Sequence, residues 1–274
     1  MKPKIFMRLF VPLLLAISFL SPLTVKAMGM PDVSARCAVL YDANSNVFLY
    51  EKNADERRGM ASTTKIATAL VVIESGRLDE VVTITSEMTG IEGSSLYLKV
   101  GERLSVKELL YGLMLRSAND ASVALATYLY GSVDAFVEEM NALCARIGLS
   151  DTHFENPHGL DGENHYTTAR ELALLSAYAE ENATFREVVS TKSIRIGEGE
   201  NRRLLVNHNK MLSMYDGVCG IKTGFTKKCG RTLVTSIYRG TGHMICVTLN
   251  APDDWSDHKK LLMYGESMLG LKQE

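Results

Sequence analysis

A helix with almost no polar face places the strongest constraint on how this chain folds. Residues 66–73, IATALVVI, are apolar at every position except Thr68. A surface helix carries polar side chains along one side, so this pattern is typical of a helix that is buried on most of its surface. We therefore predict a buried helix from Ser62 to about Ser75, ended by Gly76.

Lys65 is an unusual residue for the first turn of such a helix, because lysine is rarely buried without a partner. Either Lys65 reaches solvent and its spacing from Ser62 is accidental, or the pair is there for chemistry. Side chains three residues apart meet on one face of a helix. Ser62 also lies at the helix N-terminus, where free amides and the helix dipole favour a developing oxyanion.

The Ser-x-x-Lys spacing alone is a weak signal, since about one occurrence is expected by chance in a chain of this composition. Ser256 and Lys259 form a second one. They stand among Asp254, Asp257 and His258, and we expect these charged residues to mark a solvated terminal helix. The second pair is interpreted as a structural coincidence.

The first 27 residues have the layout of a secretory signal peptide. Lys2, Lys4 and Arg8 precede the apolar run FVPLLLAISFL, and a polar stretch then ends in Ala27. The run is shorter than the ~20 residues that span a bilayer, although a retained N-terminal anchor is the alternative. We expect a secreted, extracytoplasmic protein with a catalytic domain over residues 28–274 and no stable membrane anchor after cleavage.

Charge and cysteine usage exclude several classes of partner. A net charge of −2 argues against nucleic acid or an anionic membrane as the main partner. None of the five cysteines lies in a C-x-x-C pair, so we expect no metal site, no cofactor and mostly buried free thiols, with one disulfide left open. The cysteines are Cys37, Cys144, Cys219, Cys229 and Cys246.

The order of predicted elements indicates two lobes. Residues 37–41 and 47–51 read as strands joined by a turn, and several β-rich runs follow after about residue 190. Helical patterns fill the middle, about residues 76–190. We predict an α/β domain in which two early and three late strands form one mostly antiparallel sheet, with a cleft between the sheet and a helical lobe.

Two further short motifs follow the Ser62 helix. The chain holds one Ser-x-Asn, within RSAND at a helix junction, and one Lys-Thr-Gly, within a β-rich run. Each has a plain structural explanation, as a capped helix junction or as a strand followed by a turn. Together and in this order, the three form the set found in penicillin-binding proteins and serine β-lactamases. The residues are Ser62, Lys65, Ser117, Asn119, Lys222, Thr223 and Gly224.

With these motifs the sequence resembles the D-alanyl-D-alanine carboxypeptidases among the low-molecular-mass penicillin-binding proteins. EGSSLYLKVGE, NPHGLDG, NHNK and DGVCGIKTGFT extend the resemblance over about residues 34–270. It implies the β-lactamase/penicillin-binding-protein-like fold, a five-stranded antiparallel sheet flanked by helices plus an all-helical lobe. Many members add a β-rich domain and an amphipathic C-terminal anchor, and we expect neither here.

The nucleophile needs a base, because a serine hydroxyl is a poor nucleophile at neutral pH. The six histidines fall in predicted loops, turns or a surface helix, and none has the context of a catalytic triad. Lys65 is the candidate if it is neutral. Burial in a cleft near the cation Lys222 would lower its pKa.

The resemblance implies the remaining roles. Ser62 would attack the penultimate D-alanine of a stem peptide, and Ser117 would pass a proton to the leaving amine within a network that includes Lys65 and Lys222. Asn119 would bind the substrate's backbone amide. Lys222 and Thr223 would bind the terminal carboxylate. The substrate backbone would lie close to Gly224. The backbone amides of Ser62 and Phe225 would form the oxyanion hole.

Three positions depart from what the resemblance implies. Cys219 and Cys229 bracket the Lys-Thr-Gly run where an acid and a small residue are expected, which puts the local loop geometry in question. Arg231 replaces an aromatic residue. Its side chain either faces the cleft or is solvated or packed against a helix, and we predict that it faces the cleft and binds the substrate carboxylate. His158 is interpreted as a turn residue that stabilises its loop, with a catalytic role as the alternative.

The sequence thus predicts a serine-type D-alanyl-D-alanine carboxypeptidase that acts on peptidoglycan stem peptides and is inhibited covalently by β-lactams. A β-lactamase or a DD-endopeptidase on the same fold is an alternative, although NPHGLDG offers no glutamate of the class A β-lactamase kind. The alternative from another class is a penicillin-binding sensor without turnover.

Overall fold

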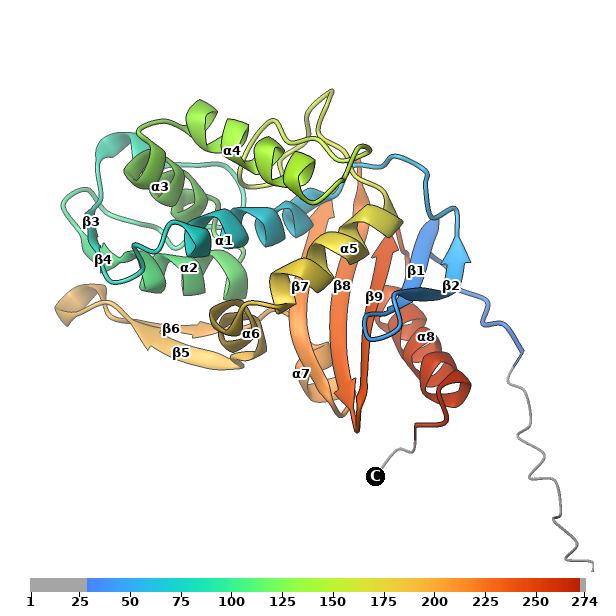
Figure 1. Cartoon of the computed structure of the whole chain (residues 1–274). Coiled ribbons are helices and arrows are strands. Elements are labelled where there is room, and N and C mark those ends of the chain that lie inside the picture. Colours follow the sequence, from blue (N-terminus) through green and yellow to red (C-terminus); the bar gives the residue numbers. More distant parts are fainter. Residues whose placement is uncertain (1–28, 272–274) are drawn as a thin grey trace, which may run out of the picture.

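A five-stranded antiparallel sheet, with strand order β2-β1-β9-β8-β7, forms one side of the molecule (Figure 1). The computed structural model describes residues 29–271, so the predicted signal peptide lies outside the described residues. The prediction that two early strands join three late ones is confirmed. The strands are β1 Cys37–Asp42, β2 Val47–Lys52, β7 Val218–Thr226, β8 Gly230–Arg239 and β9 Gly242–Leu249.

The sheet is apolar on both faces, so both faces must be covered. Val39, Val247 and Val234 lie in register across three neighbouring strands and belong to the core shared with the helical lobe. Leu40 and Cys246, which pair one position further along, belong to the core on the opposite face. Alternation along each strand therefore supplies two cores from a single sheet.

Helices cover each of these faces. Helix α8 (Asp254–Met268) packs on one face, against β8 and β9. Helices α5 (Ala169–Glu180) and α6 (Ala183–Ser190) pack on the other, α5 against β9 and β1 and α6 against β7. We had expected the helical lobe to extend to about residue 190, but these two helices belong to the sheet layer, because each buries an apolar side on the strands.

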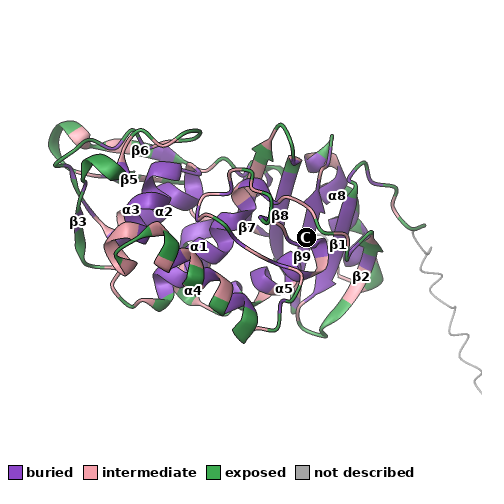
Figure 2. Cartoon of the chain, turned by 90° about the horizontal axis from the view of Figure 1, so that it is seen from above, coloured by how far each residue is buried: buried purple, intermediate pink, exposed green. Residues whose placement is uncertain are grey.

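Helix α1 (Lys65–Glu74) runs through the centre of the molecule, as Figure 2 shows. Every residue from Lys65 to Ile73 is buried, because the helix packs against α5 on the sheet side and against three helices of the lobe. The predicted buried helix is confirmed, with its first turn, η1 (Ala61–Thr64), wound as a 3-10 helix. The lobe helices are α2 Val106–Leu115, α3 Asn119–Tyr130 and α4 Val133–Arg146.

The remaining elements are short. In the lobe, β3 (Val81–Thr83) pairs with β4 (Arg103–Ser105), and the 3-10 turn η2 (Ser86–Met88) precedes the loop that leads to β4. The hairpin of β5 (Ser193–Ile196) and β6 (Arg203–Val206) lies beside α2. The 3-10 turn η3 Gly199–Asn201 and the short helix α7 Met211–Met214 complete the chain.

The interpretation of α8 as a solvated helix is wrong. Asp257 and His258 are fully buried and Asp254 is 4% exposed. The His258 ring hydrogen-bonds Thr235 on β8 and Thr248 on β9. These polar side chains are therefore buried with hydrogen-bond partners, His258 with the strand threonines and Asp257 with the segment before β1, and so sequence polarity gave the wrong exposure.

Two other sequence expectations have clear outcomes. All five cysteines are free thiols, so the disulfide that the sequence left open does not form. Within residues 29–271, none of the helices is long and apolar enough to span a membrane.

Asp257 joins helix α8 to the segment that precedes β1, and this connection can be tested. Its carboxylate accepts hydrogen bonds from the Ser34 amide, the Ser34 hydroxyl and the Ala35 amide, each at 2.8 Å. Asp257→Ala leaves these donors unpaired, and we expect the free energy of unfolding to fall by about 2–4 kcal/mol in urea denaturation. Asp253→Ala, at the exposed neighbouring position, should change it by less than about 0.5 kcal/mol. Equal effects would contradict the assignment.

Candidate active site

The sequence brings Ser62 and Lys65 together at the start of the central helix. Ala61 holds a positive φ of 47°, which turns the chain sharply into the 3-10 turn that carries Ser62. The Lys65 Nζ lies 3.2 Å from the Ser62 Oγ. Lys65 has no exposed surface, so the interpretation in which it extends to solvent is wrong.

Lys65 has two further partners, and both are oxygen acceptors. Its Nζ donates to the Asn119 Oδ1 at 2.7 Å and to the backbone carbonyl of His158. A neutral amine has two N–H donors and one lone pair. It therefore satisfies both acceptors and still accepts a proton from the Ser62 hydroxyl, which is the arrangement that a general base requires.

Electrostatics favour this neutral form. Burial holds the pKa of Lys65 well below its ordinary value, and the positive charge of Lys222 lowers it further. The Asp120 carboxylate acts in the opposite direction, as a smaller effect. Burial and the nearby cation thus both favour the neutral amine of Lys65 over the ammonium ion.

Asn119 is held rigidly at the first turn of α3. Its amide Nδ2 donates to the Glu92 carbonyl at 2.6 Å, and its backbone N–H donates to the Ser94 carbonyl at 2.7 Å. The first contact fixes which end of the side-chain amide faces Lys65. The neighbouring Ser117 is buried with φ of 59°, so both polar residues of the Ser-x-Asn motif lie at a constrained helix start.

Asp120 is a structural residue of the site that the motif did not reveal. It is 1% exposed and accepts from the Leu96 amide at 2.9 Å, the Leu98 amide at 3.1 Å and the Ser95 hydroxyl at 2.5 Å. These contacts fix the loop at residues 95–98 to the start of α3. An acidic residue directly after the motif was the available signal, but the sequence alone did not show that it is buried or which amides it binds.

Strand β7 brings the Lys-Thr-Gly residues to the Ser62 turn. Lys222 is 1% exposed, and burial lowers its pKa to about 7. Its Nζ donates to the carbonyl of Thr223 at 2.9 Å. A Cβ on Gly224 would lie 2.9 Å from the Ser62 backbone nitrogen and 2.4 Å from the Thr232 Oγ1. The absence of a side chain at Gly224 thus permits a close approach within the protein, and the close approach of a substrate backbone to Gly224 stays a prediction.

The NPHGLDG loop forms the wall behind Lys65. Asn156 Oδ1 accepts from the amides of His158 and Gly159, and the Thr68 hydroxyl donates to the Pro157 carbonyl. His158 contacts Lys65 through its backbone carbonyl, while its Nδ1 accepts from the Leu160 amide. Burial lowers the pKa of His158 to about 4, so its side chain is neutral. These contacts agree with a turn histidine that stabilises its own loop.

A cavity of about 300 Å³ opens in front of Ser62. Arg231 lines it from β8, where it pairs in register with Phe225 of β7. His208, Asp254 and Trp255 are lining residues that sequence reasoning did not assign to the site. The full lining is Ser62, Ser94, Ser117, His208, Thr223, Gly224, Phe225, Arg231, Asp254 and Trp255.

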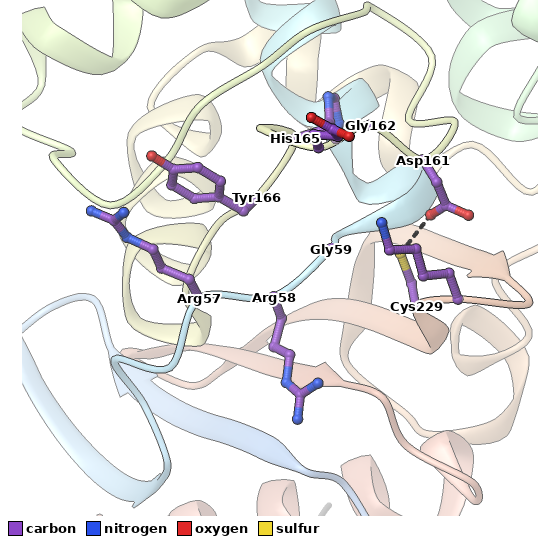
Figure 3. A pocket seen from close by; sticks show the side chains of 10 residues that line it. Arg57, Arg58, Gly59, Asp161, Gly162, His165, Tyr166 and Cys229 are labelled. Carbon is purple, nitrogen blue, oxygen red and sulfur yellow. Dashed lines mark hydrogen bonds between the residues drawn. The ribbon is translucent and has the colours of Figure 1, made fainter.

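A second cavity, of about 320 Å³, lies beside the segment that leads to Ser62, and Figure 3 shows its lining. Here the Cys229 thiol donates to the Asp161 carboxylate at 3.1 Å, along the dashed line in the figure. A Cβ on Gly59 would lie 2.4 Å from the Cys229 sulfur. Cys229 therefore packs against the Gly59 backbone and joins the β7–β8 turn to the NPHGLDG loop. These contacts describe the local loop geometry that an unexpected cysteine at position 229 left in question.

A family model described as D-alanyl-D-alanine carboxypeptidase matches residues 24–253 of the chain. The chain belongs to this family. Its motif residues 62–65, 117–119 and 222–224 all fall within the matched range, and the predicted fold class is confirmed by the solved structures that resemble it.

Named relatives cover most of the chain. D-alanyl-D-alanine carboxypeptidase DacF of Bacillus subtilis is 34% identical over 79% of the chain, and DacA of Escherichia coli is 38% identical over 89%. The chain spans 57% and 64% of the length of these two relatives. The crystal structure of the Streptomyces K15 DD-transpeptidase superposes with a TM-score of 0.82 at 33% identity, covering 87% of this chain and 99% of that one.

Lys222 offers a test of how the pKa of Lys65 is set. Lys222→Met removes a positive charge near Lys65, so the pKa of Lys65 should rise. If Lys65 acts in its neutral form, the rising limb of acylation by a fluorescent penicillin should then shift to higher pH. Lys222→Arg is charged throughout this pH range and should leave the limb in place or move it to lower pH. A limb that stays or moves to lower pH in Lys222→Met would contradict the assignment.

Proposed function

We propose that the protein is a serine-type D-alanyl-D-alanine carboxypeptidase acting on peptidoglycan stem peptides. The observation that carries the proposal is the fully buried Lys65, held 3.2 Å from Ser62 in a setting that favours a neutral amine. The family membership supports the substrate class.

The first step is acylation. Lys65 accepts the proton of the Ser62 hydroxyl as Oγ attacks the carbonyl of the penultimate D-alanine. The backbone N–H groups of Ser62 and Phe225 stabilise the tetrahedral oxyanion. The close approach of Gly224 to the Ser62 nitrogen supports this pairing, since it brings the strand segment that carries Phe225 beside the Ser62 turn.

Bond cleavage then expels the terminal D-alanine. Ser117 hands a proton to the leaving amine, and Lys65 and Lys222 return Ser117 to its resting state. Asn119 orients the substrate amide while its Oδ1 keeps the contact with Lys65. The Thr223 hydroxyl and the Arg231 guanidinium bind the terminal carboxylate, and both line the cavity that holds Ser62. Water hydrolyses the acyl-enzyme and completes the cycle.

A second outcome for the acyl-enzyme is transfer to an amine instead of water. The Streptomyces K15 protein has a closely similar fold. Its crystal structure is described as that of a DD-transpeptidase, whereas its sequence is named a D-alanyl-D-alanine carboxypeptidase. Product analysis with and without an added amino acid acceptor measures the partition. Nitrocefin turnover and muropeptide analysis separate the β-lactamase and endopeptidase alternatives, and acylation without any product would indicate a sensor.

Export is part of the proposal. The layout of residues 1–27 supports a secretory signal, and peptidoglycan lies outside the cytoplasm. β-Lactams are expected to acylate Ser62 covalently, because they offer a strained amide to the same nucleophile.

The central experiment measures D-alanine release from a pentapeptide by the purified protein. Ser62→Ala should lose this release and its labelling by fluorescent penicillin, with a nearly unchanged unfolding midpoint, because the small, half-buried hydroxyl makes little contribution to the core. Labelling of the alanine variant at another residue would show that Ser62 is not the nucleophile.

Arg231 tests the carboxylate site. A charge-assisted pair with the substrate carboxylate contributes roughly 1.5–3 kcal/mol, so Arg231→Ala should lower kcat/KM on peptide by about ten- to a hundredfold. A substrate whose terminal carboxylate is esterified should be nearly indifferent to the change. Equal losses on both substrates would remove Arg231 from the binding site.

A further inference from the structure

Within residues 29–271, six residues other than glycine hold a positive φ. Three of them are Asn46, Asn53 and Asn250, and asparagine adopts this conformation at low cost. The others are Ala61, Tyr97 and Ser117, with φ of 47°, 57° and 59°. Ala61 precedes the nucleophile Ser62 and Ser117 belongs to the second motif. Strained backbone is concentrated at functional sites, so Tyr97 calls for an explanation of the same kind.

The Tyr97 side chain makes little contribution to the core. It is 82% exposed, whereas Leu96 and Leu98 on either side of it are each 6% exposed. A strained, non-glycine backbone costs roughly 1–3 kcal/mol and persists only where its surroundings enforce it. The protein therefore holds a strained backbone conformation at a residue whose aromatic ring is exposed to solvent.

The surroundings that enforce this conformation also hold the catalytic residues. The Tyr97 amide donates to the Ser95 hydroxyl at 2.8 Å, and that hydroxyl donates to Asp120. Asp120 also accepts from the amides of Leu96 and Leu98. Because Asp120 follows Asn119, a partner of Lys65, the loop that carries Tyr97 is fixed relative to the catalytic lysine.

The same loop begins at the catalytic cavity. Ser94 lines that cavity together with Ser62, and Tyr97 lies three residues further along. The cavity volume of about 300 Å³ is at the lower end of the range for small-molecule sites, which is about 300–1,000 Å³. A stem peptide attached to a glycan strand is larger than this, so most of it must leave the cavity across the rim.

We propose that Tyr97 is a specificity-determining residue that binds the part of the substrate outside the cavity. Its ring stacks on a flat apolar face, which a saccharide ring or an aliphatic part of the stem peptide can provide. The proposal rests on the proposed function for the identity of the substrate. Its consequence is a preference for long, polymer-borne substrates over short peptides.

Tyr97→Asn removes the ring but keeps a residue that tolerates the left-handed conformation, and Tyr97→Phe is the matched control that keeps the ring. Three substrates of increasing length are compared, namely an N-acylated D-Ala-D-Ala dipeptide, the free pentapeptide and the disaccharide pentapeptide. We expect Tyr97→Asn to lower kcat/KM about five- to tenfold on longer substrates, through KM, and to leave the dipeptide unchanged. Tyr97→Phe should match the wild type throughout.

A loss that begins with the pentapeptide assigns the contact to the peptide, and one confined to the disaccharide substrate assigns it to the sugar. Equal losses on all three substrates would indicate a structural role and overturn the proposal, as would no loss on any. Co-sedimentation with isolated peptidoglycan in a Ser62→Ala background is a readout without turnover, and Tyr97→Asn should weaken it severalfold. Unchanged sedimentation overturns the proposal, whereas a wild type that releases no D-alanine would refute only the proposed function.

Discussion

The site depends on keeping one amine out of water and in place. An exposed lysine is an ammonium ion at neutral pH, and the neutral amine is favoured where burial and a neighbouring cation lower its pKa. Lys65 meets this condition because it lies on the central helix, enclosed by the lobe on one side and by the sheet layer on the other. The central position of α1 therefore accounts both for its apolar sequence and for the lowered pKa of Lys65.

Each partner of Lys65 comes from a different part of the fold. Ser62 comes from the 3-10 turn, Asn119 from the start of α3, and the carbonyl of His158 from the loop that closes behind them. Strand β7 adds Lys222 from the sheet. The helical lobe and the sheet layer must therefore pack in one fixed arrangement for the Lys65 amine to reach these acceptors. Asp120 joins the loop at residues 95–98 to the start of α3, and Cys229 joins the β7–β8 turn to the NPHGLDG loop.

The sequence was sufficient for the parts that leave a pattern in side chains. The nearly unbroken run of apolar residues predicted α1, and the order of three motifs predicted the residues that meet around Ser62. The carbonyl of His158 and the tight contact at Gly224 involve backbone atoms, and such contacts have no side-chain signature. The polar face of α8 was misinterpreted because the sequence does not show which groups pair with Asp257 and His258. In the structure these are the amides of Ser34 and Ala35 and two strand threonines.

The pairing of β1 with β9 has a consequence for how the chain reaches this structure. Cys37 pairs with Leu249, so the middle of the sheet joins segments from opposite ends of the sequence. Contacts of this separation form slowly, and a chain emerging from the ribosome lacks β9 until nearly all of it has been made. The hairpin of β1 and β2 must therefore wait for β9, while α2, α3 and α4, whose contacts are local, can already assemble. A chain that delays its sheet in this way remains unfolded longer, which would suit the export that we propose for it.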